Sequence, residues 1–462
     1  MATLPLITHE RADQVIAWRD GRPVSAGRFL ADVTQVRACL PAGRHMLNTC
    51  SDRYRFMVGL AAAMSIGKTS LLPSTQTAET VRQMLQFAPD AFCLCDADSA
   101  IPMPVCRFPA LDTASNDDIA DSAEFSVPHI DVELCVAYVF TSGSTGVPLP
   151  HAKRWGALVR NVQAEARLCG MLDGRSHAVV GTVPPQHMYG FESTVLIVMQ
   201  SANALVAGQT FYPGDICEAL RCAPRPRTLV TTPVHLRSVL GAGLELPQVD
   251  LLMSATAPLS TALAQDAEAG FGAPLLEIYG STETGQIAMR QSASTPAWQL
   301  FPGMAFEQVD GVTWVAGGHV ETRTPMSDVI EALDDGRFLL HGRMADMVNI
   351  AGKRNSLAYL NLQLNAVPGV LDGVFAMPDD AGTGEDGVAR LAAFVVAPGL
   401  TPAALTASLR ERMDPVFLPR PLVFVDALPR NATGKLPREA LAQLARRAQS
   451  AAAPTREGGG GA

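Results

Sequence analysis

The sequence predicts an α/β fold with a large N-terminal domain and a smaller α+β domain at the C-terminal end. Short runs rich in β-branched and aliphatic residues alternate with helical patterns, which is typical of parallel sheets with crossover helices. After about Gly342 the pattern changes to two shorter strands around one helix. In α/β folds the loops at the carboxyl ends of the strands carry the ligand sites.

Each apolar run of the large domain ends in small or polar residues, as strands do before a loop. The predicted strands cover residues 135–142, 177–183, 227–233, 249–255 and 274–281, and the predicted helices cover 155–168, 216–223 and 260–271. In the small domain, strands at 390–397 and 419–426 flank a helix at 401–413. These patterns predict a domain from 1 to 343, a second from 344 to 447, and a disordered, low-complexity tail from 448 to 462.

Composition and charge exclude several classes of function. Acidic residues outnumber basic ones by 45 to 36, so the formal net charge is −9 at pH 7. This balance argues against a nucleic-acid partner or an anionic lipid surface. The apolar stretch from Thr194 to Met199 is far shorter than the roughly 18 to 20 residues of a spanning helix. Without a secretory signal pattern at the N-terminal end, we expect a cytoplasmic location and no membrane span.

The chain has 9 cysteines, an odd number that argues against a disulfide framework. Cys93 and Cys95 form the only close pair, in the segment AFCLCD. A metal site would need further ligands nearby, so we interpret the pair as small apolar residues on one face of a buried strand.

The segment Thr141 to Gly146, TSGSTG, follows a predicted strand and is dense in hydroxyls and glycines. Glycine permits close backbone approach, and converging N–H and O–H groups make a cradle for an anion. A plain Ser/Gly turn is the alternative. A second phosphate-loop candidate, Gly67 to Ser70, is rejected because Ala62 stands where the first glycine is required and because a helical run precedes it.

Four motifs together resemble those of the adenylate-forming superfamily, which includes acyl- and aryl-CoA synthetases, peptide-synthetase adenylation domains and luciferases. They are TSGSTG, YGSTETG at 279–285, DDGRFLLHGRMADMVNIAGKR at 334–354 and LPRNATGK at 428–435. The resemblance implies a large α/β domain of several subdomains and a small mobile domain that rotates between two half-reactions. It also implies ATP and Mg²⁺ as cofactors, activation of a carboxylic acid as an acyl adenylate, and transfer of the acyl group to a thiol.

The resemblance assigns nucleotide contacts residue by residue. The β- and γ-phosphates fall to Thr141, Ser142, Gly143, Ser144, Thr145 and Gly146. Tyr279, with Gly280 and Ser281 beside it, would lie along the adenine, Thr282 would touch the α-phosphate, and Glu283 would hold Mg²⁺. The strand end Ser254, Ala255 and Thr256 would border the adenine, and Asp328 with Arg343 would bind the ribose.

The same resemblance assigns the chemistry and the substrate side. It assigns catalytic roles to Lys435, Thr282 and His187, and the point charge of Lys435 would neutralise the carboxylate and the α-phosphate as they approach. His187, Tyr189 and Gly190 would line the acid pocket together with Ser254 and Ala255. Ala345 occupies the hinge position, and Gly352 belongs to the loop beside the thiol tunnel.

Three departures refine the functional hypothesis. Leu149 stands where many members have a lysine, and Lys153 or His151 is a candidate replacement. The hinge residue is alanine, and the chain is short before its first motif. These features resemble the stand-alone ligases of aryl-polyene and xanthomonadin-type pigment pathways, which load hydroxybenzoate-like acids onto an acyl carrier protein. We therefore expect an aromatic acid as substrate and a carrier-protein or CoA phosphopantetheine as acceptor. The alternatives are a medium- or long-chain fatty acyl ligase and an inactive adenylation-like binding protein.

Overall fold

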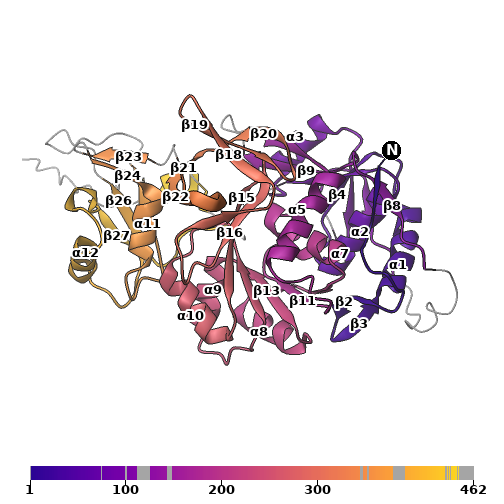
Figure 1. Cartoon of the computed structure of the whole chain (residues 1–462), viewed down its shortest axis with the longest axis horizontal. Helices are drawn as coiled ribbons and strands as arrows, with labels where there is room; N and C mark the ends of the chain where they lie inside the picture. The colour runs from indigo at the N-terminus through magenta and orange to yellow at the C-terminus, as the bar shows by residue number, and fades with distance from the viewer. Residues whose placement is uncertain are drawn as a thin grey trace, which may run out of the picture. The chain divides into compact units, whose positions relative to one another are not determined.

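The chain divides into two compact units (Figure 1). The first comprises residues 1–326 and 332–338, and the second comprises residues 327–331 and 339–462. The computed structural model describes residues 2–73, 75–98, 101–111, 125–142, 148–343, 347–350, 353–377, 391–431, 434, 436–437, 439–444 and 446. The domain boundary between 343 and 344 stays a prediction, and the predicted tail, 448–462, lies outside the described residues.

The first unit contains a six-stranded sheet near its N-terminal end. Its strands, in spatial order, are β10 (Pro148–Arg154), β9 (Cys135–Ser142), β5 (Thr69–Leu72), β4 (His45–Asn48), β6 (Phe92–Cys95) and β7 (Val105–Arg107). All neighbours are parallel except β10, which pairs antiparallel with β9. Cys93 and Cys95 lie buried on β6, which confirms the strand interpretation of that pair.

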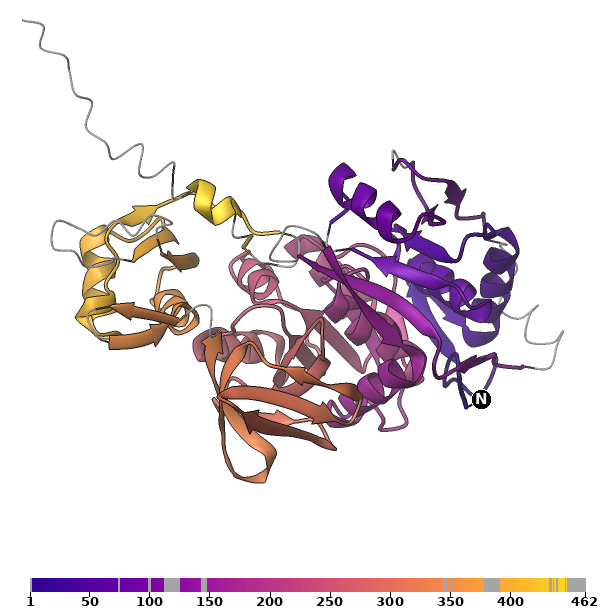
Figure 2. The same cartoon turned by 90° about the horizontal axis from the view of Figure 1, so that it is seen from above.

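An eleven-stranded sheet lies mainly in the first unit. Its spatial order is β21 (Asp328–Ala332), β22 (Arg337–Arg343), β17 (Trp298–Leu300), β16 (Gly285–Arg290), β15 (Leu275–Ser281), β14 (Leu251–Ser254), β13 (Arg227–Thr231), β11 (Ala178–Gly181), β12 (Ala204–Val206), β2 (Val15–Arg19) and β3 (Arg22–Ser25). Within this order the neighbouring strands β15, β14, β13, β11, β12 and β2 run parallel to one another. Most of β21 and the end of β22 belong to the second unit. In Figure 2 the strands β11 to β15 of the larger sheet are pink, and the strands β4 to β9 of the smaller sheet are indigo to purple. The predicted alternation of strands and helices is therefore confirmed.

Helices cover these sheets and connect their strands. They are α1 (Ala26–Cys39), α2 (Arg53–Ser65), α3 (Ala78–Phe87), α5 (Trp155–Leu168), α6 (Met188–Gly190), the π-helix η1 (Phe191–Leu196), α7 (Ile197–Gln200), α8 (Pro213–Cys222), α9 (Pro233–Leu240), α10 (Thr261–Phe271) and the short η2 (Asp334–Gly336). Figure 1 places α8, α9 and α10 beside one another along the larger sheet, over a common apolar core. No helix of the described residues has the length and apolar character needed to cross a bilayer.

Local signals explain where the helices of the larger sheet begin and end. Ser260 caps α10 by accepting a hydrogen bond from the Leu263 N–H, and Gly272 ends the helix in the left-handed region at φ 68°. Thr232 caps α9 in the same way, directly after the end of β13. These caps place short polar turns at the carboxyl ends of the parallel strands.

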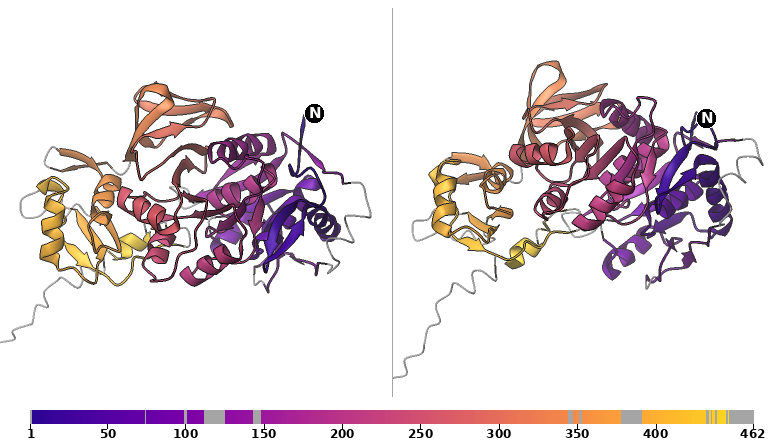
Figure 3. Two further views of the ribbon diagram at one scale, coloured as in Figure 1. Left: turned by 60° about the horizontal axis from the view of Figure 1, so that its bottom comes forward. Right: turned by 90° about the horizontal axis from the view of Figure 1, so that it is seen from below.

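Two small antiparallel sheets complete the first unit. The strands β18 (Met304–Val309), β19 (Val312–Gly317) and β20 (Val320–Pro325) form one of them, which Figure 3 shows as orange hairpins projecting from the rest of the unit. The strands β1 (Thr3–Pro5) and β8 (His129–Asp131) form the other. The turn between β19 and β20 carries His319.

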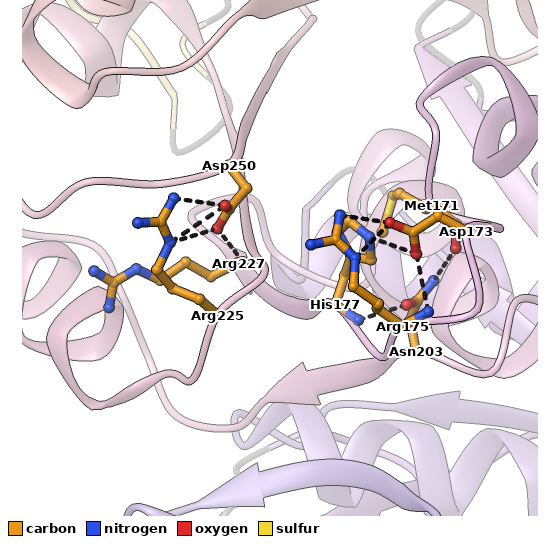
Figure 4. A network of polar contacts seen from close by, with 8 residues as sticks. All are labelled: Met171, Asp173, Arg175, His177, Asn203, Arg225, Arg227 and Asp250. Atoms are coloured by element: carbon orange, nitrogen blue, oxygen red, sulfur yellow. Dashed lines mark hydrogen bonds and ion pairs between the residues drawn. The ribbon is translucent and has the colours of Figure 1, made fainter.

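The amino edge of the parallel sheet is closed by polar contacts (Figure 4). The Asn203 side chain accepts from the His177 backbone N–H at 2.7 Å and so joins the starts of β11 and β12. Arg225 binds Asp250 through two nitrogens, and the Arg227 backbone N–H donates to the same carboxylate at 2.8 Å. These contacts join the starts of neighbouring strands, whereas the ligand sites of parallel α/β sheets lie at the opposite, carboxyl edge.

The second unit is a small α+β structure. Its elements are β23 (Met347–Ile350), β24 (Lys353–Ser356), α11 (Leu357–Asn365), β25 (Asp372–Ala376), β26 (Ala392–Val396), α12 (Pro402–Arg410), η4 (Pro415–Phe417) and β27 (Leu422–Phe424). β26 pairs antiparallel with β25 and parallel with β27. Leu360, Leu364, Val395 and Leu405 anchor its separate core, which confirms the predicted α+β architecture.

Candidate active site

The YGSTETG motif forms a tight hairpin between β15 and β16. Ser281 pairs with Gly285, and the three residues Thr282 to Thr284 form the turn at its tip. The Ser281 hydroxyl accepts from the Thr284 N–H at 3.2 Å, and the Thr284 hydroxyl accepts from the Ser281 N–H at 3.2 Å. A Cβ on Gly280 would lie 2.2 Å from the Gly285 carbonyl oxygen, so only glycine fits there. The turn is therefore held rigidly while it presents Thr282 and Glu283.

The Glu283 carboxylate is partly exposed and has basic neighbours. Its Oε1 lies 3.8 Å from Nε2 of His151, and its backbone oxygen accepts from Nζ of Lys153 at 3.3 Å. Burial raises the pKa of Glu283. Hydrogen bonds from its own backbone and from Ser281, and the charges of His151 and Lys153, lower it by more. The pKa of Glu283 therefore lies below its usual value. Glu283 is thus a carboxylate ready to bind a hard cation.

Strand β10 brings the two candidate replacements for the missing lysine to the site. Every second side chain of this strand points to the same side, which carries Leu149, His151 and Lys153. The Leu149 side chain is 56% exposed. His151 Nε2 hydrogen-bonds the Thr141 hydroxyl at 3.0 Å, so one ring contacts both the glycine-rich segment and Glu283. Lys153 is buried and directed at the Glu283 backbone. The two residues therefore have different roles.

The predicted adenine-side residues lie at the carboxyl ends of neighbouring strands. Ser254 ends β14 beside Thr231 of β13, and its fully buried hydroxyl has no hydrogen-bond partner among the described residues. Thr256 follows at φ 79°, a strained backbone for a β-branched residue. Tyr279 packs against Trp298 and Phe338, at centroid distances of 5.5 and 5.9 Å. An unsatisfied buried hydroxyl next to a strained turn is typical of a ligand site.

The predicted acid-side residues form a compact turn after β11. His187 caps α6 by accepting from the Tyr189 N–H at 3.3 Å. A Cβ on Gly190 would lie 2.1 Å from the Pro184 carbonyl oxygen, which restricts this position to glycine. Burial raises the pKa of Tyr189, and its phenol lies against the backbone of Thr231. The turn therefore places His187 and Tyr189 at the same sheet edge as Ser254.

A buried arginine that the sequence did not single out anchors this turn. Arg53 donates to the carbonyl oxygens of Gly181 and Val183 at 2.7 and 3.0 Å, and to the Thr194 hydroxyl at 2.8 Å. Burial lowers the pKa of Arg53 to about 10, and the charge of Asp52 opposes this shift. The three partners of Arg53 surround the segment that carries His187.

Two buried glutamates lie behind the motif turn and were also missed. Glu192 accepts from Asn161 Nδ2 at 2.5 Å, and Glu165 accepts from the Ser193 hydroxyl at 2.6 Å. Gln286 donates to the same Ser193 hydroxyl at 2.8 Å. The available signal was the sequence of α5, where Asn161 and Glu165 share the face of buried apolar residues.

Several predicted residues cannot be placed in the site. Gly143 to Gly146, Ala345, Gly352 and Lys435 lie outside the described residues. Ser142 ends β9, Arg343 ends β22, and Asp328 begins β21. Asp328 and Arg343 belong to the second unit, whereas the residues discussed so far belong to the first. Their assignment to the ribose stays a prediction.

The loop before Lys435 is nevertheless anchored within the second unit. Arg430 binds Asp372, at the start of β25, through Nε at 2.6 Å and Nη2 at 2.8 Å. Its Nη1 donates to the Gly434 carbonyl oxygen at 2.9 Å, and Gly434 adopts φ 76°. The bidentate ion pair with Asp372 fixes Arg430. Arg430 in turn holds Gly434, the residue that directly precedes the predicted catalytic lysine.

The donors present at the motif turn fit Mg²⁺ bound with a polyphosphate. In the described part of the chain, no cluster of three or more His, Cys, Asp or Glu side chains is arranged to hold a metal. Mg²⁺ commonly binds through one or two carboxylates, with phosphates and waters as the other ligands. Glu283 supplies such a carboxylate. Thr282, its neighbour in the sequence, and Thr141, at the start of the TSGSTG motif, each supply a hydroxyl oxygen, which is also a hard ligand.

Comparison with known proteins now identifies the family. The family of AMP-binding enzymes matches residues 13–310, and the C-terminal domain of AMP-binding enzymes matches residues 364–435. The chain belongs to the AMP-binding enzyme family. It is therefore a member of the adenylate-forming superfamily, whose enzymes use ATP, generally with Mg²⁺. The predicted superfamily, fold class and cofactors are confirmed.

Individual relatives of this AMP-binding enzyme are ligases. A 4-coumarate–CoA ligase of Rhodobacter capsulatus is 31% identical over 307 residues, covering 66% of this chain and 75% of the relative. A fatty acid–acyl-carrier-protein ligase of Streptomyces coeruleorubidus is 27% identical over 365 residues, or 68% of both chains. The o-succinylbenzoate CoA synthetase of Bacillus subtilis, solved with its acyl-adenylate intermediate, has a TM-score of 0.78 at 17% identity, over 96% of this chain and 98% of that one.

Proposed function

We propose that this AMP-binding enzyme activates an aromatic carboxylic acid with ATP and transfers the acyl group to a phosphopantetheine thiol. In the first step a carboxylate oxygen attacks the α-phosphorus, the bond to the β-phosphate oxygen breaks, and pyrophosphate leaves. In the second step the thiolate sulfur attacks the acyl carbonyl carbon and AMP leaves. Both steps conserve oxidation state and need no further reactant.

The assignment of an aromatic acid rests on Tyr189 and Ser254, which lie at the same sheet edge. Tyr189 contributes a buried ring, and Ser254 contributes a buried hydroxyl that lacks a partner among the described residues. Such surroundings suit a flat ring that carries a polar substituent, because a buried hydroxyl is costly to leave unpaired. The similarity to a coumarate ligase supports the same class of acid.

Residues of the first unit, together with Lys435 of the second, would divide the work of nucleotide binding. Thr141 begins the phosphate segment, Glu283 would hold Mg²⁺, and Thr282 beside it would contact the α-phosphate. Mg²⁺, when bound, supplies charge neutralisation to the triphosphate. His151 contacts both Thr141 and Glu283, which supports His151 over Lys153 as the replacement for the lysine missing at Leu149 and as a donor to a phosphate. Lys435 would stabilise the charge that develops at the α-phosphate.

The test is carboxylate-dependent ATP–pyrophosphate exchange on the full chain, with benzoates, cinnamates and fatty acids compared at equal concentration. We expect 4-hydroxybenzoate or a related aromatic acid to support faster exchange than palmitate. Faster exchange with palmitate would favour the fatty acyl alternative, which the Streptomyces relative represents. No exchange with any acid would refute the proposed activity and favour an inactive binding protein.

The acceptor is tested separately, because the relatives use both CoA and carrier protein. The acyl adenylate formed from the best acid is offered to free CoA and to holo acyl carrier proteins, and thioester formation is measured for each. Following the resemblance to pigment-pathway ligases, we expect a carrier protein to be the better acceptor. Faster thioester formation with free CoA than with every carrier protein would refute that part.

A further inference from the structure

Four buried polar side chains from separate elements lie against the backbone of Glu283 to Gly285. They are Lys153 of β10, Asn161 of α5, Glu192 of η1 and His319 of the β19–β20 turn. Their exposed fractions are 9%, 1%, 1% and 6%, so all four are at least nine-tenths buried. We call this set the turn support.

The turn support donates to two successive carbonyl oxygens of the turn. Lys153 Nζ lies 3.3 Å from the Glu283 oxygen, and His319 Nε2 lies 3.0 Å from the Thr284 oxygen. Because a carbonyl oxygen only accepts, the neutral His319 ring carries its proton on Nε2. Burial lowers the pKa of His319 to about 4, which keeps the ring neutral.

The third contact is made by Gly285, the residue that closes the turn. A Cβ at this position would lie 2.6 Å from Asn161 Nδ2 and 2.9 Å from Glu192 Oε1. The glycine therefore lets the backbone touch the turn support directly, at φ 71°, where glycine is favoured. Three consecutive residues, Glu283 to Gly285, are thus fixed from the same side.

Lys153 is the costly member of this arrangement. Burial lowers its pKa, opposed by the charges of Glu192 and Glu283. An apolar residue of similar length would avoid the loss of hydration of an ammonium group. The ammonium therefore has a geometric purpose, since it is the donor that reaches the Glu283 carbonyl.

We propose that Lys153 is a positioning residue that holds the Glu283 backbone so that the carboxylate meets the Mg²⁺–ATP complex in a fixed geometry. It does so without contacting the triphosphate. The inference rests on the proposed function only in taking Glu283 as the Mg²⁺ ligand. Lys153 thus supports the metal-binding turn from within the protein, while His151 faces the phosphate segment.

The experiment measures ATP binding by calorimetry, once with Mg²⁺ and once with EDTA, on the full chain and its variants. Lys153→Met removes the donor and keeps an unbranched side chain. Lys68→Met is the matched control, because Lys68 is also 9% exposed and its Nζ donates to backbone oxygens of Ala42 and Gly43, outside the turn support. Binding needs no acid and no turnover, so the readout is independent of catalysis.

We expect Lys153→Met to weaken Mg²⁺–ATP binding about tenfold or more, which corresponds to about 1.4 kcal/mol. Metal-free ATP binding should change much less, and Lys68→Met should change neither. A Lys153→Met protein with wild-type Mg²⁺–ATP affinity overturns the proposal. So does an equal loss with and without Mg²⁺, because a purely structural role would not distinguish the two.

A second variant keeps the test decisive if Lys153→Met does not fold. Lys153→Gln retains a polar group for Glu192 but is too short to reach the Glu283 carbonyl, and we expect the same selective loss. Wild-type Mg²⁺–ATP affinity in that variant also overturns the proposal. If the unaltered protein binds ATP equally with and without Mg²⁺, the assignment of Glu283 under the proposed function is wrong, and the positioning role of Lys153 falls with it.

Discussion

Replacing Glu165 by glutamine should change how the stability of the first unit depends on pH. Glu165 is fully buried on α5, and its Oε1 accepts from the Ser193 hydroxyl at 2.6 Å. Burial raises the pKa of this carboxyl from 4.5 to about 7, and the hydrogen bonds from Ser193 and Gln286 offset only part of that rise. Between about pH 4.5 and pH 7, Glu165 therefore keeps its proton in the folded protein but has released it in the unfolded chain.

The sign and the size of the effect follow from this shift. Between about pH 4.5 and pH 7 the folded state binds more protons than the unfolded state, so stability falls as the pH rises through that window. A tenfold change in proton affinity is about 1.4 kcal/mol, so the contribution lost by pH 8 is on the order of 3 kcal/mol. Glu165→Gln has no proton to lose and removes this slope.

The assay is the thermal midpoint of unfolding measured from pH 5 to pH 8.5. At about 2 to 4 °C per kcal/mol, the midpoint of Glu165→Gln relative to wild type should rise by roughly 5 °C or more across the range. Glu218→Gln, on the exposed side of α8, is the control and should follow the wild type. Parallel curves for Glu165→Gln and wild type would refute the reasoning.

Three further predictions concern the assigned site. Lys435→Ala should slow pyrophosphate exchange roughly a hundred- to a thousandfold yet still consume a chemically made acyl adenylate, and unchanged exchange would contradict the assignment. Glu283→Gln should raise the Mg²⁺ concentration needed for half-maximal exchange, because it removes the charge that holds the cation, and an unaltered Mg²⁺ titration would place the metal elsewhere. Ala345→Pro should spare exchange but lower thioester formation at least about tenfold, since proline restricts the rotation at the predicted hinge. Equal loss of both half-reactions would point to misfolding or to a different hinge residue, with Asp346 the next candidate.

Much of the fold was predictable because its signals are local. The helical pattern at 155–168 matches α5, and the five strands predicted in the large domain are all present. Gly280 and Gly285 are glycines because the hairpin leaves no room for a Cβ at Gly280 and has φ 71° at Gly285. Each of these helices, strands and glycine positions depends on residues that are close in the sequence, so a sequence pattern could indicate it.

The surroundings of the motifs were not predictable in the same way. The sequence alone determined the family, the ATP chemistry and the order of strands and helices, because motif residues and apolar periodicity lie within short segments. Only the tertiary structure decided that Lys153 points at the Glu283 backbone, that His151 joins Thr141 to Glu283, and that Glu192 is buried. The contacts of β10 with the β15–β16 turn, from Lys153 and His151 to Glu283, join segments more than a hundred residues apart. A side chain's burial and partners depend on which distant segment packs against it, and no pattern within its own segment contains that information.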